Sequence, residues 1–135
     1  MKRYDVQSVY LEVPCESAFA LVADPAQLPR WTNAFESVSK GRAVMRTPQG
    51  RVEVELAVQA QPATGTVDWR MVFPDGSVAT AFSRLTALDA RSCIYAFVLT
   101  PPPVALEHLE GALDAQSRTL AEELERLKGI LETHA

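Results

Sequence analysis

The chain has 135 residues, 47% hydrophobic and 22% charged, with a formal net charge of -4. This length suits a single domain, residues 1–135, that buries its own core without a metal or a disulfide. The mildly acidic charge and the scattered arginines lack the footprint of a nucleic-acid binder. No stretch approaches the ~18 apolar residues of a membrane span. We therefore expect a cytoplasmic protein without an integral membrane segment.

Sequence motifs for metals, phosphates and nucleophiles are missing. Cys15 and Cys93 lie far apart without metal-ligand spacing, which predicts free and mostly buried thiols. No H-E-x-x-H, G-x-S-x-G or glycine-rich phosphate loop occurs. We expect no metal site and no cofactor.

The first third of the chain predicts one strand followed by two short helices. Residues Tyr4 to Val13 alternate partly between apolar and polar, as in a strand that Pro14 ends. Helical spacing follows over Cys15 to Ala23. Asp24 to Gln27 then reads as a helix start, with an N-cap, a proline at the first helical position and a capping box. This second helix is expected to end near Trp31.

The middle of the chain predicts an antiparallel sheet. Apolar and polar residues alternate most clearly over Arg51 to Gln59, which indicates one buried and one wet face. Turn signals stand at Pro48 to Gly50 and at Pro74 to Gly76. The expected strands are Glu36 to Thr47, Arg51 to Gln59, Thr66 to Phe73, Ser77 to Ala87 and Ser92 to Thr100. In the last two, both faces carry apolar residues, so the pattern does not assign their buried side.

A helix of roughly 30 residues is predicted after Pro103, about 45 Å long at 1.5 Å per residue. Its leucines recur with the 3.6-residue period of one helix face. The apolar stripe consists of Leu106, Leu109, Leu113, Leu120, Leu124, Leu127 and Leu131. The covered face of the sheet is the only large apolar surface that this stripe can bury itself against.

In this order of elements the chain resembles the START-like, or SRPBCC, superfamily. That group includes birch-pollen-allergen-like, polyketide cyclase/dehydrase-like and coenzyme Q-binding proteins. The resemblance covers nearly the whole chain and is most specific from Val9 to Pro14, from Ser17 to Pro25 and from Leu28 to Trp31. It implies an α+β helix-grip fold: a curved antiparallel sheet of about six strands, two short helices after the first strand, and a long C-terminal helix packed across the sheet. It also implies a cavity between helix and sheet.

Gln116 is the polar residue that stands out in the leucine stripe, because a buried amide must find partners. It would orient a ligand or bond to backbone or buried water. Large aromatic residues and small alanines near the stripe suit an adaptable apolar pocket, and equally an ordinary core. The candidate ligand-binding residues are Trp31, Phe35, Trp69, Met71, Phe73, Leu109, Ala112, Leu113 and Gln116.

Three residues are weak candidates for catalysis. Arg84 would polarise a carbonyl if it points inward, Tyr95 would donate from the sheet, and His108 flanks the stripe with a side chain suited to acid–base work. Each also has an ordinary structural reading. Whether the protein is an enzyme therefore stays open.

The sequence is compatible with three functions. The first is binding or carriage of a small, largely apolar ligand such as a lipid, a quinone or an aromatic, polyketide-like compound. The second is a cyclase or dehydratase that uses the same cavity. The third is a protein-interaction module, which predicts a filled core and an exposed apolar patch. The sequence does not determine the oligomeric state.

Overall fold

A computed structural model describes residues 3–47, 50–100 and 112–133. It contains seven strands and three α-helices, with a short 3-10 helix between the first two helices. In chain order these are β1 (Asp5–Leu11), α1 (Cys15–Val22), η1 (Pro25–Gln27), α2 (Leu28–Trp31), β2 (Phe35–Ser39), β3 (Arg42–Thr47), β4 (Gly50–Gln61), β5 (Thr66–Val72), β6 (Val78–Asp89), β7 (Ser92–Leu99) and α3 (Ala112–Thr133).

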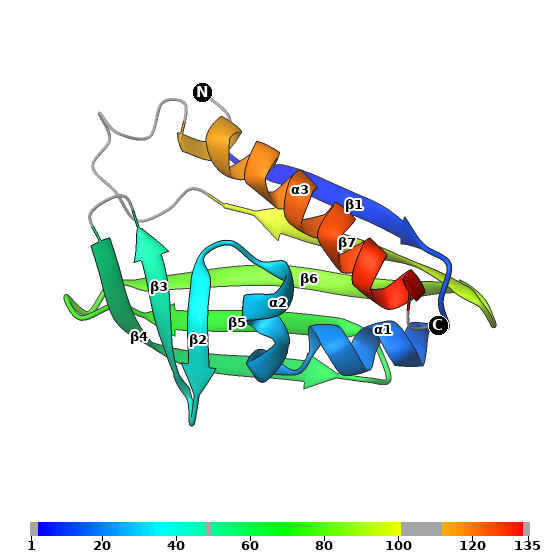
Figure 1. Ribbon diagram of the computed structural model, residues 1–135, viewed down its shortest axis with the longest axis horizontal. Helices are drawn as coiled ribbons and strands as arrows, with labels where there is room; N and C mark the ends of the chain where they lie inside the picture. The colour runs from blue at the N-terminus through cyan, green and yellow to red at the C-terminus, as the bar shows by residue number, and fades with distance from the viewer. Residues whose placement is uncertain (1–2, 48–49, 101–111, 134–135) are drawn as a thin grey trace.

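The strands form a single antiparallel sheet in the order β1-β7-β6-β5-β4-β3-β2. Strand β1 is the first in sequence, yet it pairs with β7, the last strand, from Asp5 opposite Leu99 to Leu11 opposite Cys93. Every other neighbouring pair is consecutive in the chain. Strands β1 and β2 therefore form the two edges of the sheet, and helices α1 and α2 lie in the connection between them (Figure 1).

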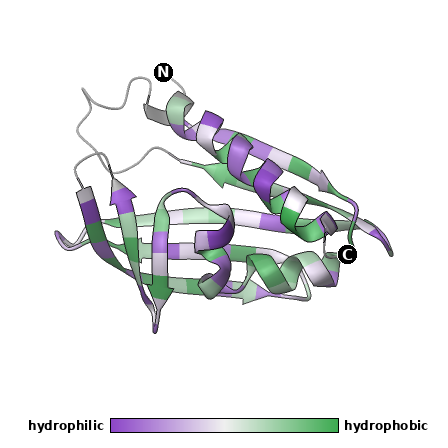
Figure 2. Ribbon diagram, viewed as in Figure 1, coloured by the Kyte–Doolittle hydropathy of each residue, from purple (hydrophilic) through white to green (hydrophobic). Residues whose placement is uncertain are grey.

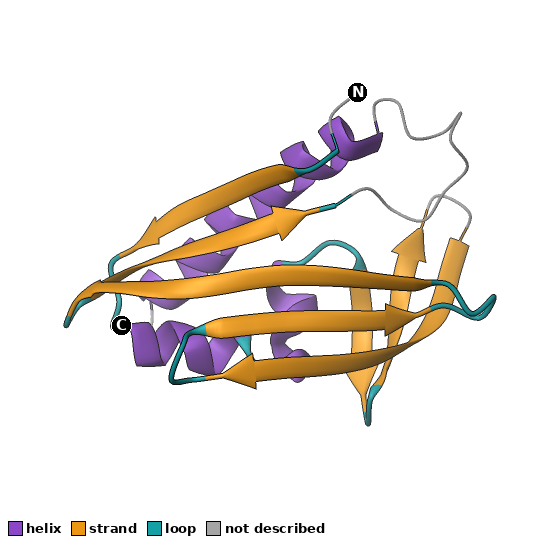
Figure 3. Ribbon diagram, turned by 180° about the vertical axis from the view of Figure 1, so that it is seen from behind, coloured by secondary structure: helices purple, strands orange, loops and turns teal. Residues whose placement is uncertain are grey.

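The helices all lie on one face of the sheet, and Figure 3 shows the strands of the other face uncovered. Helix α3 packs mainly along the edge strand β1, with fewer contacts to β7 and α2. Lys128 Nζ donates to the Tyr10 carbonyl at 2.7 Å, and the Glu12 backbone N–H donates to Glu132 at 2.8 Å. These bonds fix the C-terminal half of α3 against the end of β1.

The core lies between these helices and the inner face of the sheet. The described part of the leucine stripe is buried at Leu120, Leu124, Leu127 and Leu131, which confirms the amphipathic pattern. Figure 2 shows the corresponding alternation of hydrophilic and hydrophobic residues along α3, whereas α1 is largely hydrophobic. Burial of each such leucine contributes roughly 1.5–3 kcal/mol.

One predicted strand is in fact two. The segment Glu36 to Thr47 is interrupted at Lys40 and Gly41, whose φ angles of 53° and 77° turn the chain into the β2–β3 hairpin. A two-residue hairpin of this kind needs positive φ at both central positions, and lysine is not a usual residue there. The sheet therefore has seven strands instead of about six.

The other strand predictions agree with the structure to within a few residues. In β4, Val54 and Leu56 are buried while Glu53 and Glu55 are exposed, as the alternation predicts. Asp24 caps η1 by accepting a hydrogen bond from the Ala26 backbone N–H at 3.1 Å. The segment 101–111, which includes the expected start of the long helix after Pro103, lies outside the described residues.

Both thiols are free, as the sequence indicates. Cys93 is buried and Cys15 is half-buried; desolvation, with the neighbouring Cys15 as a smaller cause, raises the pKa of the Cys93 thiol to about 11. No helix in the described part of the chain is long and apolar enough to span a bilayer.

Candidate functional site

A cavity of about 770 Å³ lies between the N-terminal half of α3, the α2–β2 connection and the inner side of the sheet. Helix α3 packs mainly against the edge strand β1, which leaves the cavity between the helix and strands β5, β6 and β7. Its volume falls within the roughly 300–1,000 Å³ of typical small-molecule sites. Its lining consists of Leu28, Trp31, Thr32, Asn33, Ala34, Phe35, Met45, Arg46, Trp69, Met71, Phe73, Val78, Ala79, Thr80, Ala81, Phe97, Val98, Leu99, Thr100, Ala115, Gln116, Thr119, Leu120 and Glu123.

Aromatic rings form one wall of the cavity. Trp69 stacks on Phe97 with ring centroids 5.9 Å apart, and Trp31 packs against Trp69 at 6.4 Å. Behind them, Tyr95 makes an edge contact with Trp31 at 6.2 Å. Ring pairs at these distances stabilise one another, so the wall is held in a defined shape.

The two tryptophans carry buried polar atoms without partners. The indole N–H groups of Trp31 and Trp69 donate no hydrogen bond within the described residues, and both side chains are almost fully buried. An unpaired buried N–H group costs free energy. Within the described residues, both N–H groups are therefore unsatisfied donors on side chains that line the cavity.

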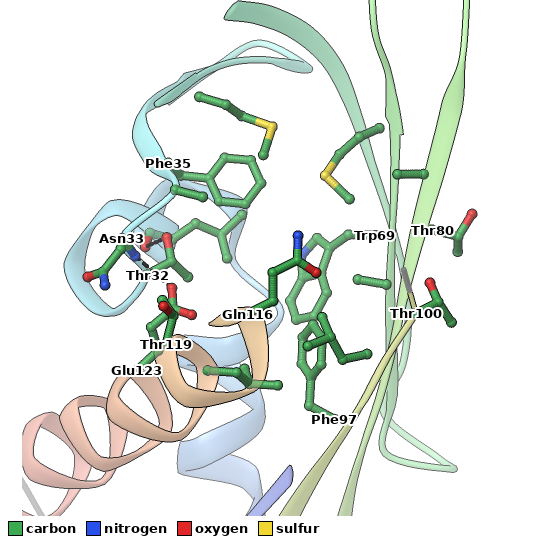
Figure 4. Close-up of a pocket in the computed structure, with 18 of the residues that line it drawn as sticks. Thr32, Asn33, Phe35, Trp69, Thr80, Phe97, Thr100, Gln116, Thr119 and Glu123 are labelled. Atoms are coloured by element: carbon green, nitrogen blue, oxygen red, sulfur yellow. Dashed lines mark hydrogen bonds between the residues drawn. The ribbon is translucent and has the colours of Figure 1, made fainter. Parts of the chain in front are cut away.

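Polar side chains of α3 face the cavity along one row. Gln116, Thr119 and Glu123 are spaced three and four residues apart, which places them on a single helix face. Figure 4 shows Gln116 projecting from α3 toward Trp69, and shows Thr32, Asn33, Thr119 and Glu123 gathered on the side of the cavity away from the sheet. The cavity thus has an aromatic wall at Trp69 and Phe97 and a polar row on α3, with Thr80 and Thr100 as further polar residues on the sheet side.

Glu123 is the buried carboxyl group of this row, with 9% of its surface exposed. Its Oε2 accepts a hydrogen bond from the Asn33 backbone N–H at 2.6 Å. Burial raises the pKa of Glu123, and the Asn33 N–H and Arg126 offset part of that rise. The remaining oxygen, Oε1, accepts no hydrogen bond from the described residues.

The loop that faces Glu123 is held by two arginines. Arg126 Nη1 donates to Asn33 Oδ1 at 2.8 Å, and Arg46 Nη1 donates to the Asn33 carbonyl oxygen at 3.1 Å. Thr32 donates its hydroxyl to the Leu28 carbonyl at 2.7 Å. Asn33 is therefore fixed by its N–H, its carbonyl and its side chain, so the polar side of the cavity is preorganised.

Solved structures share this architecture at low sequence identity. A START superfamily protein from Mycobacterium smegmatis aligns with a TM-score of 0.70 and 14% identity, covering 99% of this chain and 100% of that one. The Zhui aromatase/cyclase from Streptomyces aligns at 0.68 and 13%, covering 96% and 93%. The di-domain ARO/CYC BexL aligns at 0.69 and 18%, covering 97% of this chain and 47% of BexL. No protein-family model and no curated protein matches the sequence.

The chain has the START-like, helix-grip fold. These likenesses establish the architecture, which the sequence resemblance predicted.

Many of the candidate ligand-binding residues line the cavity. Trp31, Phe35, Trp69, Met71, Phe73 and Gln116 all do so. Leu109 lies outside the described residues, as do the side chains of Ala112 and Leu113. Contact of any of these residues with a ligand stays a prediction.

The two catalytic candidates that the structure describes, Arg84 and Tyr95, lie outside the cavity lining. Arg84 is exposed because it belongs to the outward-facing set of β6, opposite Ala96 of β7. Tyr95 points inward but is fully buried beneath Trp31 and does not line the cavity, and burial raises the pKa of its phenol. His108 lies outside the described residues. Neither Arg84 nor Tyr95 is positioned to act on a molecule in the cavity.

Sequence reasoning missed Glu123, Thr119 and Asn33. A signal for the first two existed, since Glu123 stands seven residues after Gln116 and three after Leu120, within the apolar stripe. Because a glutamate is usually assigned to the solvent-exposed face of a helix, Glu123 was not recognised as a cavity residue. Asn33 carried no such signal, because its role depends on the fold of the α2–β2 connection.

Replacing Glu123 by glutamine is expected to stabilise the protein at neutral pH. Because the folded-state pKa is raised, the folded carboxyl keeps its proton to a higher pH than the unfolded one, so the charged form destabilises the fold above the ordinary value of 4.5 and the effect disappears below it. Thermal unfolding should therefore show a higher midpoint for E123Q at neutral pH, with a gap that narrows toward pH 4.5. A gap that stays constant with pH would contradict a raised pKa.

Proposed function

We propose that this helix-grip protein binds or carries a small, largely apolar molecule, inside the cavity between α3 and the sheet. The observation that carries the proposal is the cavity itself: about 770 Å³, with an aromatic wall and a few fixed polar groups. Mostly apolar sites with a few convergent polar groups are the usual form of small-molecule pockets. A cavity of this size does not fit the filled core expected of an interaction module.

A cyclase or dehydratase is the second candidate. Two proteins of this fold are described as aromatase/cyclase enzymes, and Glu123 places a buried carboxyl at the cavity. A carboxyl group with a raised pKa is suited to proton transfer. Against this, Arg84 and Tyr95 do not reach the cavity, so carriage is the better supported proposal.

Tryptophan fluorescence gives a direct test, because the chain has two tryptophans and both line the cavity. We expect a bound aromatic compound to quench their emission in a saturable way and to raise the unfolding temperature, as any ligand selective for the folded state does. Anthracene derivatives are suitable probes since they absorb where tryptophan emits. Trp69→Phe, which should keep a partial signal from Trp31, and free tryptophan serve as controls.

The natural ligand can be sought in parallel. Native mass spectrometry of protein purified from its expression host, followed by organic extraction, would identify any co-purified compound. A saturable fluorescence change without a co-purified compound would still support the cavity as a binding site. The absence of any response to lipids, quinones and polycyclic aromatics, by fluorescence and by thermal shift, would refute the proposal.

A further inference from the structure

The polar side of the cavity combines groups that select a particular ligand chemistry. Glu123 presents Oε1 with no partner among the described residues, while Oε2 is occupied by the Asn33 N–H. A carboxylate oxygen accepts hydrogen bonds and repels anions. A ligand at this position therefore has to bring a donor.

The surrounding charges argue against a cationic donor. Arg46 lines the cavity, and Arg126 lies close enough to Glu123 to lower the pKa of its carboxyl, so positive charge is already present on this side of the site. A protonated amine would meet these arginines, whereas a carboxylate ligand would meet Glu123. A neutral hydroxyl group satisfies Oε1 without adding charge to a buried site.

The opposite wall determines the rest of the ligand. Trp69 and Phe97 are stacked, with an angle of 23° between their planes, and Phe35 lies at the other side of the cavity in Figure 4. Flat aromatic surfaces favour a flat apolar body with faces that can stack. Gln116 projects between this wall and the polar row, where its amide can bond to a second polar group.

We propose that the cavity selects neutral, hydroxyl-bearing polycyclic aromatic molecules, and that Glu123 is the specificity-determining residue, accepting the hydrogen bond of the ligand hydroxyl through Oε1. This inference deepens the proposed function and depends on it. It predicts discrimination against fatty acids and other carboxylates, which the fold alone would allow.

The test uses anthracene probes that differ in one substituent at the same ring position: hydroxyl, methyl ether, carboxylate or aminomethyl. Binding is measured through quenching of tryptophan emission in the full chain. The hydroxyl probe is expected to bind most tightly. Glu123→Gln should weaken it about tenfold, because hydrogen bonds to charged groups are worth that much. The same variant should leave the methyl ether unchanged and strengthen the carboxylate.

Two further variants separate specificity from folding. Glu125→Gln removes the same charge from an exposed residue of the same helix whose charge is not among the causes of the Glu123 pKa shift, and should leave all four affinities unchanged. Glu123→Asp keeps the charge but withdraws the carboxylate by one methylene, and should also weaken the hydroxyl probe selectively. Circular dichroism and thermal unfolding verify that each variant is folded.

The outcomes distinguish the inference from the function on which it depends. Equal binding of the hydroxyl and methyl ether probes, unaffected by E123Q, would overturn the role of Glu123 and leave carriage of an apolar ligand standing. Tightest binding of the carboxylate or the aminomethyl probe by the wild type would likewise overturn it. Failure of all four probes to bind any variant would count against the cavity as a ligand site at all.

Discussion

Gly65→Ala is expected to destabilise the protein severely, by about 3 kcal/mol or more. A Cβ at this position would lie 2.1 Å from the backbone oxygen of Leu85, in the middle of β6. The clash would also displace the Gly65 carbonyl, which accepts the Leu85 N–H at 2.8 Å. The loss combines a hydrogen bond of about 1 kcal/mol, strain of roughly 1–3 kcal/mol, and the cost of a left-handed backbone at φ 74°.

Gly76→Ala is the matched control for this substitution. Gly76 has a similar φ of 86°, but nothing lies within 4 Å of the position of its Cβ. Its replacement should cost only the conformational penalty, about 1 kcal/mol. Urea unfolding followed by circular dichroism compares the two variants. Similar losses at both glycines would show that the close approach of Gly65 to β6 is not energetically important.

Leu127→Ala is expected to lower the free energy of unfolding by about 3 kcal/mol. Leu127 is fully buried, with 0% exposure, in the part of α3 that packs against the core. Removing its side chain leaves a void that the surrounding residues fill only partly. Because small domains are stable by about 5–15 kcal/mol, this loss is a large fraction of the total.

Leu88→Ala is the corresponding exposed control, since Leu88 near the end of β6 is 53% exposed. The same atoms are removed there, and the expected change is within about 0.5 kcal/mol. Equal effects at Leu127 and Leu88 would contradict the placement of α3 on the core.

The ligand experiments should be interpreted only for variants that retain the wild-type unfolding midpoint or exceed it.

Local sequence patterns were sufficient to predict most of the fold. The alternation of Val54 and Leu56 with Glu53 and Glu55 predicted β4, and the spacing of the α3 leucines predicted its buried face. These predictions succeed because burial on one face imposes a period of two on strands and 3.6 on helices. The β2–β3 hairpin was missed because a lysine rarely adopts a positive φ, so Gly41 alone was not interpreted as part of a two-residue turn.

Residue patterns alone were enough to predict the class of fold, the presence of a long amphipathic helix, and Gln116 as a polar residue on its apolar face. Which residues share the cavity depends on how the helices and strands pack in three dimensions. Asn33 and Glu123 are 90 residues apart, and their 2.6 Å hydrogen bond exists because α3 packs beside the α2–β2 connection. Periodicity reports which side of an element is buried, whereas a site depends on which elements meet and at what distance. The pairing of β1 with β7 brings the last strand beside the first. Helix α3, which follows β7, therefore packs near the elements at the start of the chain.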